Sequence, residues 1–133
     1  MKKIILSVVL LLVAQLTIAQ DEFKADVIKV IKASGSASQM ELAKDQIKAM
    51  IPEAKFEEFS KEFDETLPSL YDAMAENYMT SYTHDDVKEM LKFYESPVGK
   101  KISDTASEIL KKNMESGKEW GMALQGMMMK YME

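Results

Sequence analysis

The sequence predicts an all-α protein, a small helical bundle of about five or six helices that follows a cleaved signal peptide. Apolar residues recur at spacings of three and four along almost the whole chain, as they do on helix faces that pack together. No segment alternates apolar and polar residues in the manner of a strand, and the Asn-Gly and Asp-Gly pairs of tight hairpins are absent. We therefore expect a signal peptide at residues 1–19 and a single helical domain at residues 20–133.

The first nineteen residues have the three parts of a secretory signal. Lys2 and Lys3 form a charged start, an apolar run follows, and Ala19 ends a small-x-small cleavage motif. The run is shorter than the ~20 apolar residues of a transmembrane helix, and the absence of Cys excludes a lipidated cysteine. We expect an exported protein, periplasmic or secreted, with no stable membrane span after cleavage.

The charge of the chain disfavours nucleic acid as a partner. Lys2 and Lys3 leave with the signal, so the 17 basic residues fall to 15 against 22 acidic ones, a net charge of −7. All basic residues are Lys, and Arg, whose planar fork suits phosphate groups, is absent. An acidic chain of this kind lacks the basic surface that binds a phosphate backbone, and we expect no nucleic-acid partner.

Two helices are expected in the first part of the domain. QDEFKADVIKVIKAS, residues 20–34, carries one apolar stripe, which consists of Phe23, Val27, Val30 and Ile31. Gly35 then provides a left-handed residue at the helix end, and Ser36 or Ser38 provides a cap for a second helix at about 39–51. Pro52 cannot donate its amide, so we expect the second helix to end there.

The next stripe raises the question of what Pro68 does. Apolar residues continue nearly in phase on both sides of this proline, and they include Phe56, Phe59, Phe63, Leu67, Leu70, Tyr71, Met74 and Tyr78. Either two short helices meet at Pro68 or one longer helix is kinked there. Because an interior proline costs about 3 kcal/mol of helix stability, we expect a break or a sharp kink.

A helix with clear start and stop signals follows. Thr83 is the expected N-cap, and Asp86 stands three residues later in the position of a capping box, although that motif prefers Glu or Gln. The helix carries an apolar stripe made of Val87, Met90, Leu91 and Tyr94, and it should end near Glu95 because the residue before Pro97 is pushed out of helical conformation.

The stretch KFYESPVGKKI, residues 92–102, joins this helix to the last one. Ser96 is expected as N-cap, Pro97 as the first helical residue, and Gly99 as a point where a neighbouring backbone can approach closely. The last helix keeps its apolar phase to Tyr131, with gaps at Asn113 and Gly117. The Gly117-x-x-x-Gly121 spacing suggests a thinned or bent helix that fits against the bundle.

The residues around this joint resemble a known family. They are Tyr82-Thr83, Phe93-Tyr94-x-Ser96-Pro97-Val98-Gly99-x-Lys101 and Gly117-x-x-Trp120. Over about residues 80–122, and more loosely back to residue 33, the chain resembles a family of exported bacterial proteins catalogued as domain of unknown function 2059. The resemblance implies a helical fold and an exported location, and it implies no activity, catalytic residue or cofactor.

The chain has few of the residues that enzyme chemistry usually requires. It has no Cys, no Gly-x-Ser-x-Gly motif and a single histidine, His84, for which no partner serine can be named. HDDVKE, residues 84–89, contains carboxylates on one helix face, but no second His or Cys completes a metal site. We predict that the protein is not an enzyme and has no catalytic residues, metal site or cofactor. A hydrolase of unrecognised type, acting through His84, is one alternative.

The C-terminal tail GMALQGMMMKYME supports another alternative. It carries five of the twelve methionines, which are Met122, Met127, Met128, Met129 and Met132. Thioethers select Cu(I), but methionine also fills cores and lines adaptable binding surfaces. A Met-rich envelope protein that binds Cu(I) is therefore the second hypothesis.

The function that we predict is a non-enzymatic interaction or adaptor module of the cell envelope. Its partner is an unknown envelope protein or a second copy of the chain. The hypothetical contact patch consists of Phe93, Tyr94, Ser96, Pro97 and Gly99. Phe93 lies about 100° around its helix from Tyr94 of the buried stripe, so its ring is either an exposed contact or packs beneath the next helix.

Overall fold

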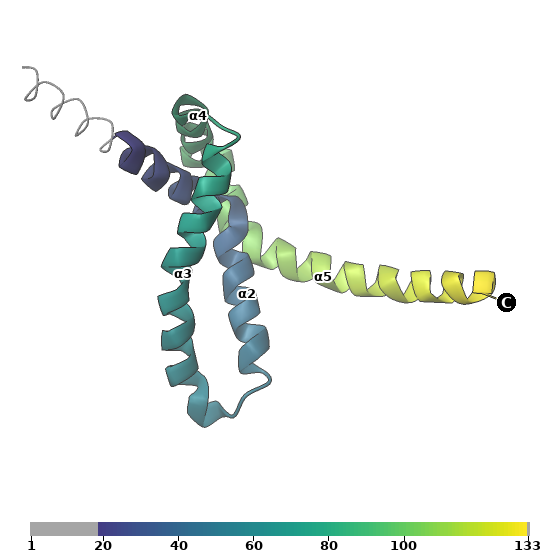
Figure 1. Ribbon diagram of the computed structural model, residues 1–133. Coiled ribbons are helices and arrows are strands. Elements are labelled where there is room, and N and C mark those ends of the chain that lie inside the picture. Colours follow the sequence, from purple (N-terminus) through teal and green to yellow (C-terminus); the bar gives the residue numbers. More distant parts are fainter. Residues whose placement is uncertain (1–18, 133) are drawn as a thin grey trace, which may run out of the picture.

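The computed structural model describes residues 19–132 (Figure 1). In this range residues 19–31 are helical, and the elements that follow are η1 (Lys32–Ser36), α2 (Ala37–Lys48), η2 (Glu53–Lys55), α3 (Phe56–Met79), α4 (His84–Glu95) and α5 (Pro97–Met132). Every regular element of the described chain is a helix, which confirms the all-α class. Both ends are described for four α-helices, α2 to α5, and the expected count of five or six is not confirmed. The predicted signal peptide lies outside the described residues except for Ala19.

Helices α2 and α3 form a hairpin that points away from the rest of the described chain (Figure 1). The turn between them contains Pro52, whose extended backbone (ψ 141°) separates the two helices, and α2 ends a few residues before the expected limit at 51. Lys44, a buried residue of α2, donates to both carboxylate oxygens of Asp64 on α3 at 2.7 and 2.8 Å. This ion pair raises the pKa of Lys44 and joins the two arms of the hairpin.

The core lies where residues 19–31 meet the second half of α3 and the start of α4. Its buried apolar residues are Val27, Val30, Ile31, Tyr71, Ala75 and Val87. The partly buried side chains around them include Phe23, Leu67, Met74, Met90, Leu91 and Tyr94. The stripes predicted for the first helix and for α4 therefore both face this core.

The expected turn at residues 35–38 is a kink rather than a capped break. Gly35 adopts the predicted left-handed conformation (φ 98°), but Ser36 is helical and its side chain makes no capping hydrogen bond. The helical path therefore continues through η1 into α2 with a change of direction. At this kink the Oγ of Ser103 on α5 donates to the carbonyl of Ala33 at 2.7 Å.

Of the two alternatives expected at Pro68, the break into two short helices is wrong, because α3 runs as one helix from Phe56 to Met79 with the proline inside it. Pro68 lies on the exposed side, whereas Leu67, Tyr71 and Ala75 stand on the face that packs into the core. Full burial of a large apolar side chain contributes about 1.5–3 kcal/mol. The buried Tyr71, together with the partly buried Leu67, Met74 and Tyr78 on the same helix, outweighs the ~3 kcal/mol that the proline costs.

The last helix, α5, leaves the core and projects away from it (Figure 1). From residue 111 to residue 132 every residue is exposed except Leu124, which is half-buried. A Cβ added at Gly117, Gly121 or Gly126 would meet nothing within 4 Å. The expectation that these glycines fit the helix against the bundle is therefore wrong, and the methionine tail does not fill the core.

Within residues 19–132, none of the helices combines the length and the apolar composition that a bilayer crossing requires.

Candidate functional site

The start of α4 is fixed by the predicted capping box. The Thr83 side chain accepts from the Asp86 backbone amide at 3.2 Å, and the Asp86 carboxylate accepts from the Thr83 backbone amide at 2.8 Å. The Thr83 hydroxyl also donates to the same carboxylate oxygen, at 2.6 Å. These hydrogen bonds, the hydroxyl's first, hold the pKa of Asp86 below its usual value. The shorter Asp side chain thus satisfies the motif in place of Glu.

The joint between α4 and α5 is built by Ser96, Pro97 and Gly99. The Ser96 Oγ accepts from the Gly99 amide at 3.1 Å and donates to the Phe93 carbonyl at 2.6 Å, so one hydroxyl caps α5 and closes α4. Pro97 is the first residue of α5, as predicted. Gly99 is buried against the backbone of Phe93 and Tyr94. The close approach expected at Gly99 is therefore present.

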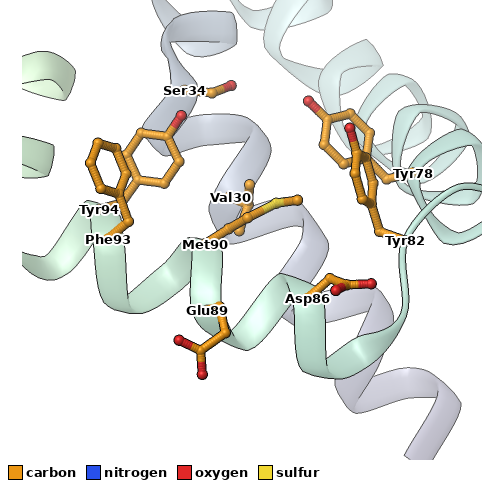
Figure 2. Close-up of a pocket in the computed structure, with 9 residues that line it drawn as sticks. All are labelled: Val30, Ser34, Tyr78, Tyr82, Asp86, Glu89, Met90, Phe93 and Tyr94. Atoms are coloured by element: carbon orange, nitrogen blue, oxygen red, sulfur yellow. The ribbon is translucent and has the colours of Figure 1, made fainter.

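Beside this joint lies an open groove of about 520 Å³ with an aromatic lining, which we call the aromatic groove (Figure 2). It is lined by Val30, Ser34, Tyr78, Tyr82, Asp86, Glu89, Met90, Phe93 and Tyr94. Phe93 and Tyr94 stand at one side with their rings 5.2 Å apart, and Tyr78 and Tyr82 stand at the other, 5.6 Å apart. Residues 19–31, the kink, the end of α3 and α4 therefore all contribute to one concave, mainly apolar surface.

Comparison with known proteins concerns the same part of the chain. A family model described as an uncharacterized protein conserved in bacteria (DUF2059) matches residues 69–126. The resemblance seen in the sequence is confirmed. The DUF2059 segment begins in α3, contains all of α4 and the joint, and includes most of α5. No curated protein and no solved structure matches the chain.

The structure separates the five residues of the hypothetical contact patch into two groups. Phe93 and Tyr94 line the aromatic groove, and Phe93 is 47 % exposed rather than packed beneath α5. Ser96, Pro97 and Gly99 do not line it; they form the joint that fixes how α5 leaves α4. In the DUF2059 segment, the Phe-Tyr-x-Ser-Pro-Val-Gly string thus combines a groove wall with an architectural joint.

Sequence reasoning missed the opposite wall of the groove. Tyr78 was placed in the α3 stripe and Tyr82 only at the start of the next helix, although the structure sets both rings across from Phe93 (Figure 2). A signal was available, because Tyr78, Tyr82, Phe93 and Tyr94 are four of the ten Tyr and Phe residues and all lie near the two ends of one short helix. Their convergence depends on the angle between α3 and α4, which no local pattern encodes.

His84, the one histidine, makes a structural contact in the described chain. Its Nε2 lies 3.1 Å from the Oδ2 of the buried Asp26, and its ring stacks on Phe23 with 5.0 Å between centroids. Lys29 donates to the other Asp26 oxygen at 2.7 Å; this bond first, and the His84 contact second, hold the pKa of Asp26 below its ordinary value. Asp26 therefore joins the first helix to α4.

The geometry around His84 bears on the hydrolase and metal alternatives. A His–Asp pair is the orienting half of a catalytic triad, but no serine or threonine hydroxyl in the described residues is hydrogen-bonded to His84. Within residues 19–132, no three His, Asp or Glu side chains gather in a geometry that could hold a metal ion. The carboxylate of Asp86 is instead engaged by Thr83, and Glu89 is paired with Lys92.

The methionines of the tail are all strongly exposed. Met122, Met127, Met128, Met129 and Met132 each show more than half of their surface to solvent. Successive residues of a helix point about 100° apart, so the consecutive thioethers of residues 127–129 face different directions. The Cu(I) alternative gains no preformed cluster from this arrangement within the described residues.

Proposed function

We propose that this protein is a non-enzymatic interaction module of the cell envelope that binds an apolar segment of another envelope protein in the aromatic groove. The observation that carries the proposal is the exposed Phe93 ring beside a concave surface that also includes Tyr78, Tyr82 and Tyr94. Contiguous exposed apolar surface marks interaction sites, and aromatic side chains are enriched at the centres of protein interfaces. A groove of ~520 Å³ holds a few anchoring side chains.

The negative charge around the groove indicates which kind of segment it would bind. Asp86, which is bonded to the neutral Thr83, and Glu89, which is paired with Lys92, add carboxylates to the lining of the groove. The chain as a whole is acidic, with a net charge of −5. An apolar anchor flanked by Lys or Arg would complement this surface, whereas an acidic segment would be repelled. The proposed ligand is therefore a segment with an aromatic or aliphatic anchor and neighbouring basic residues.

The cell-envelope location is part of the proposal and has its own test. The signal predicted at residues 1–19 and the exported location implied by the family support it. We expect the protein recovered from the envelope fraction to begin at Gln20, which intact-mass measurement detects. Recovery of a chain that retains residues 1–19 in the cytoplasm would contradict the location and leave the groove hypothesis to its own experiment.

The binding experiment uses a photo-crosslinking amino acid at position 93 in living cells. The matched control is the same amino acid at Leu70, an exposed apolar residue of α3 outside the groove lining. We expect one envelope protein to be crosslinked from position 93 and not from position 70. With that partner purified, Phe93→Ala should weaken binding roughly tenfold or more, as loss of a central aromatic contact does.

The controls decide what a negative result means. Phe93 is exposed, so Phe93→Ala should leave the helical circular dichroism and the unfolding midpoint close to those of the wild type. If positions 93 and 70 crosslink the same proteins, or if the folded Phe93→Ala variant binds the purified partner with unchanged affinity, the aromatic groove is not the binding site.

A further inference from the structure

Helix α5 carries a second apolar surface, made of residues that do not line the aromatic groove. Val98, Ile109, Trp120 and Tyr131 recur at intervals of eleven residues, which is three turns of a nearly straight α-helix. They therefore lie in line along one side of α5. Ile102 and Met127 lie on the same line, and we call these six residues the α5 stripe: Val98, Ile102, Ile109, Trp120, Met127 and Tyr131.

The α5 stripe is exposed along its whole length. Its six members show between 42 % and 80 % of their surface to solvent. The contacts of α5 with the rest of the chain centre on a neighbouring side, where Gly99 is buried against α4 and Ser103 is bonded to the kink. Ile109 lies at the edge of that side, where it lines a hollow with Gly35 and Gln39, and it is still half exposed. A helix of 36 residues, about 54 Å long, thus presents an apolar line to solvent that is interrupted between Ile109 and Trp120. Its opposite side carries Lys111, Glu115 and Lys118 together with Met122.

We infer that the α5 stripe is covered by the α5 stripe of a second copy of this chain, in antiparallel orientation. The order of residues along the stripe favours this occupant, because it is complementary to itself when reversed about the midpoint between residues 114 and 115. Val98 then faces Tyr131 of the second copy, Ile102 faces Met127, and Ile109 faces Trp120. Two of the three contacts pair an aliphatic side chain with a larger aromatic one, the third pairs Ile102 with Met127 of about equal volume, and each occurs twice, as two-fold symmetry requires.

A parallel pair is a poorer fit to the same residues. It would place Trp120 against Trp120 and Val98 against Val98, so the narrow contacts would gather in the first half of α5 and the wide ones in the second half. It would also bring the two cores together at one end, whereas the antiparallel pair separates them to opposite ends of the helices (Figure 1). The middle of the antiparallel pair contains the small polar side chains of Asn113 and Ser116.

Charge at the centre of the antiparallel pair is also complementary. Lys112 and Glu119 lie on the same flank of the stripe, about 80–100° around the helix from Trp120. Lys112 pairs with Glu108 of its own helix at 2.6 Å. In the proposed register it also comes opposite Glu119 of the second copy, offset by two residues, and symmetry repeats this contact. At each end of the pair, Lys101 of one copy comes near Lys130 of the other. Both side chains are exposed to solvent, which screens the repulsion between their charges.

The available area is that of a specific interface. An aromatic side chain buries about 150–250 Å², and six side chains at the observed exposures offer on the order of 700 Å² on each copy. The pair would bury roughly 1,400 Å², within the ~1,200–2,000 Å² of stable protein interfaces. This inference is independent of the aromatic groove, which is lined by residues of other elements.

The first test measures the mass of the protein in solution by analytical ultracentrifugation, which distinguishes a monomer from a dimer. It uses the full-length protein purified from the cells that produce it. Trp120→Glu and Met122→Glu form a matched pair of variants, because both residues are 67 % exposed on α5 but Met122 points about 160° away from the stripe. We expect a wild-type dimer, a Met122→Glu dimer, and at least a tenfold weaker association of Trp120→Glu. Helical circular dichroism verifies that both variants are folded.

The second test measures orientation. The chain has no Cys, so a nitroxide attached to Gln125→Cys, an exposed position outside the stripe, labels each copy once. At a rise of ~1.5 Å per residue, the antiparallel register separates the two labels by about 30 Å along the helix axis, whereas a parallel pair leaves no axial separation and only the width of the two helices between them. A short distance overturns the antiparallel pairing. A monomer at all concentrations, or equal effects of Trp120→Glu and Met122→Glu, overturns the interface.

Discussion

Substitution of Gly99 by alanine tests the joint between α4 and α5 directly. The added Cβ would lie 2.5 Å from the Cα of Tyr94, 2.7 Å from the carbonyl carbon of Phe93, and closer still to the oxygen of that carbonyl. All three atoms belong to the backbone, so no side chain can rotate away and the two helices must move apart. Overpacking of this kind typically costs 1–3 kcal/mol, occasionally more.

The expected magnitude follows from two opposed effects. In a helix interior, alanine is favoured over glycine by about 1 kcal/mol, and this gain is set against a steric cost at or above the upper end of that range. We expect Gly99→Ala to lower the free energy of unfolding by about 2 kcal/mol. For a domain of this size the unfolding midpoint should fall by roughly 10 °C.

The assay is urea and thermal unfolding followed by far-UV circular dichroism. Fluorescence of Trp120 is a poor reporter, because this residue lies on the exposed part of α5 and not in the core. The matched control is Gly117→Ala in the same helix, where an added Cβ meets nothing within 4 Å and no stability should be lost. If Gly99→Ala and Gly117→Ala unfold alike, the reasoning about the joint is refuted.

Three further substitutions test the contacts that hold the first helix, the kink and α5 in place. Asp26→Asn should cost about 1–3 kcal/mol at neutral pH, as loss of hydrogen bonds to charged groups does. Because the folded-state pKa of Asp26 is lowered, this contribution to stability is complete above about pH 4 and is lost as the pH falls through the folded pKa. The urea midpoints of wild type and variant should therefore converge in acid. A difference that stays constant with pH would contradict this role of Asp26. Ser96→Ala should cost about 0.5–2 kcal/mol in the same assay through loss of the α5 cap, and a neutral result would show that the cap contributes nothing. Gly35→Ala should cost about 1–2 kcal/mol, because the residue is held at φ 98° with its Cβ position 3.2 Å from Ala106, and a variant as stable as wild type would show that the kink relaxes freely.

The parts of the fold that the sequence predicted are those fixed by neighbouring residues. Thr83 caps α4 and Pro97 begins α5, because capping and proline geometry depend on atoms within three or four positions. The left-handed Gly35 belongs to the same class. These predictions needed no knowledge of what each helix packs against.

The predictions that were wrong depended on tertiary partners. The expected break at Pro68 considered only what the proline costs the helix. The burial of Tyr71 and the partial burial of Leu67 on the same helix outweigh that cost. The glycines of α5 were assigned to close packing because Gly117 and Gly121 have the right spacing, but spacing does not state whether a neighbour is present. The same limit explains why Tyr78 and Tyr82 were not recognised as a wall of the groove.

The joint connects the two surfaces proposed for binding. Because Gly99 presses the first turn of α5 onto the backbone of Phe93, the direction of α5 and the position of the Phe93 ring are fixed by the same contact. On the α4 side of the joint, Phe93 and Tyr94 line the aromatic groove. On the α5 side, the exposed Val98 is the first residue of the α5 stripe. The string that carries the family resemblance is therefore best understood as the element that holds a groove and a projecting helix at a set angle. A substitution there, such as Gly99→Ala, should disturb partner binding and self-association together, whereas Phe93→Ala and Trp120→Glu should each disturb only one.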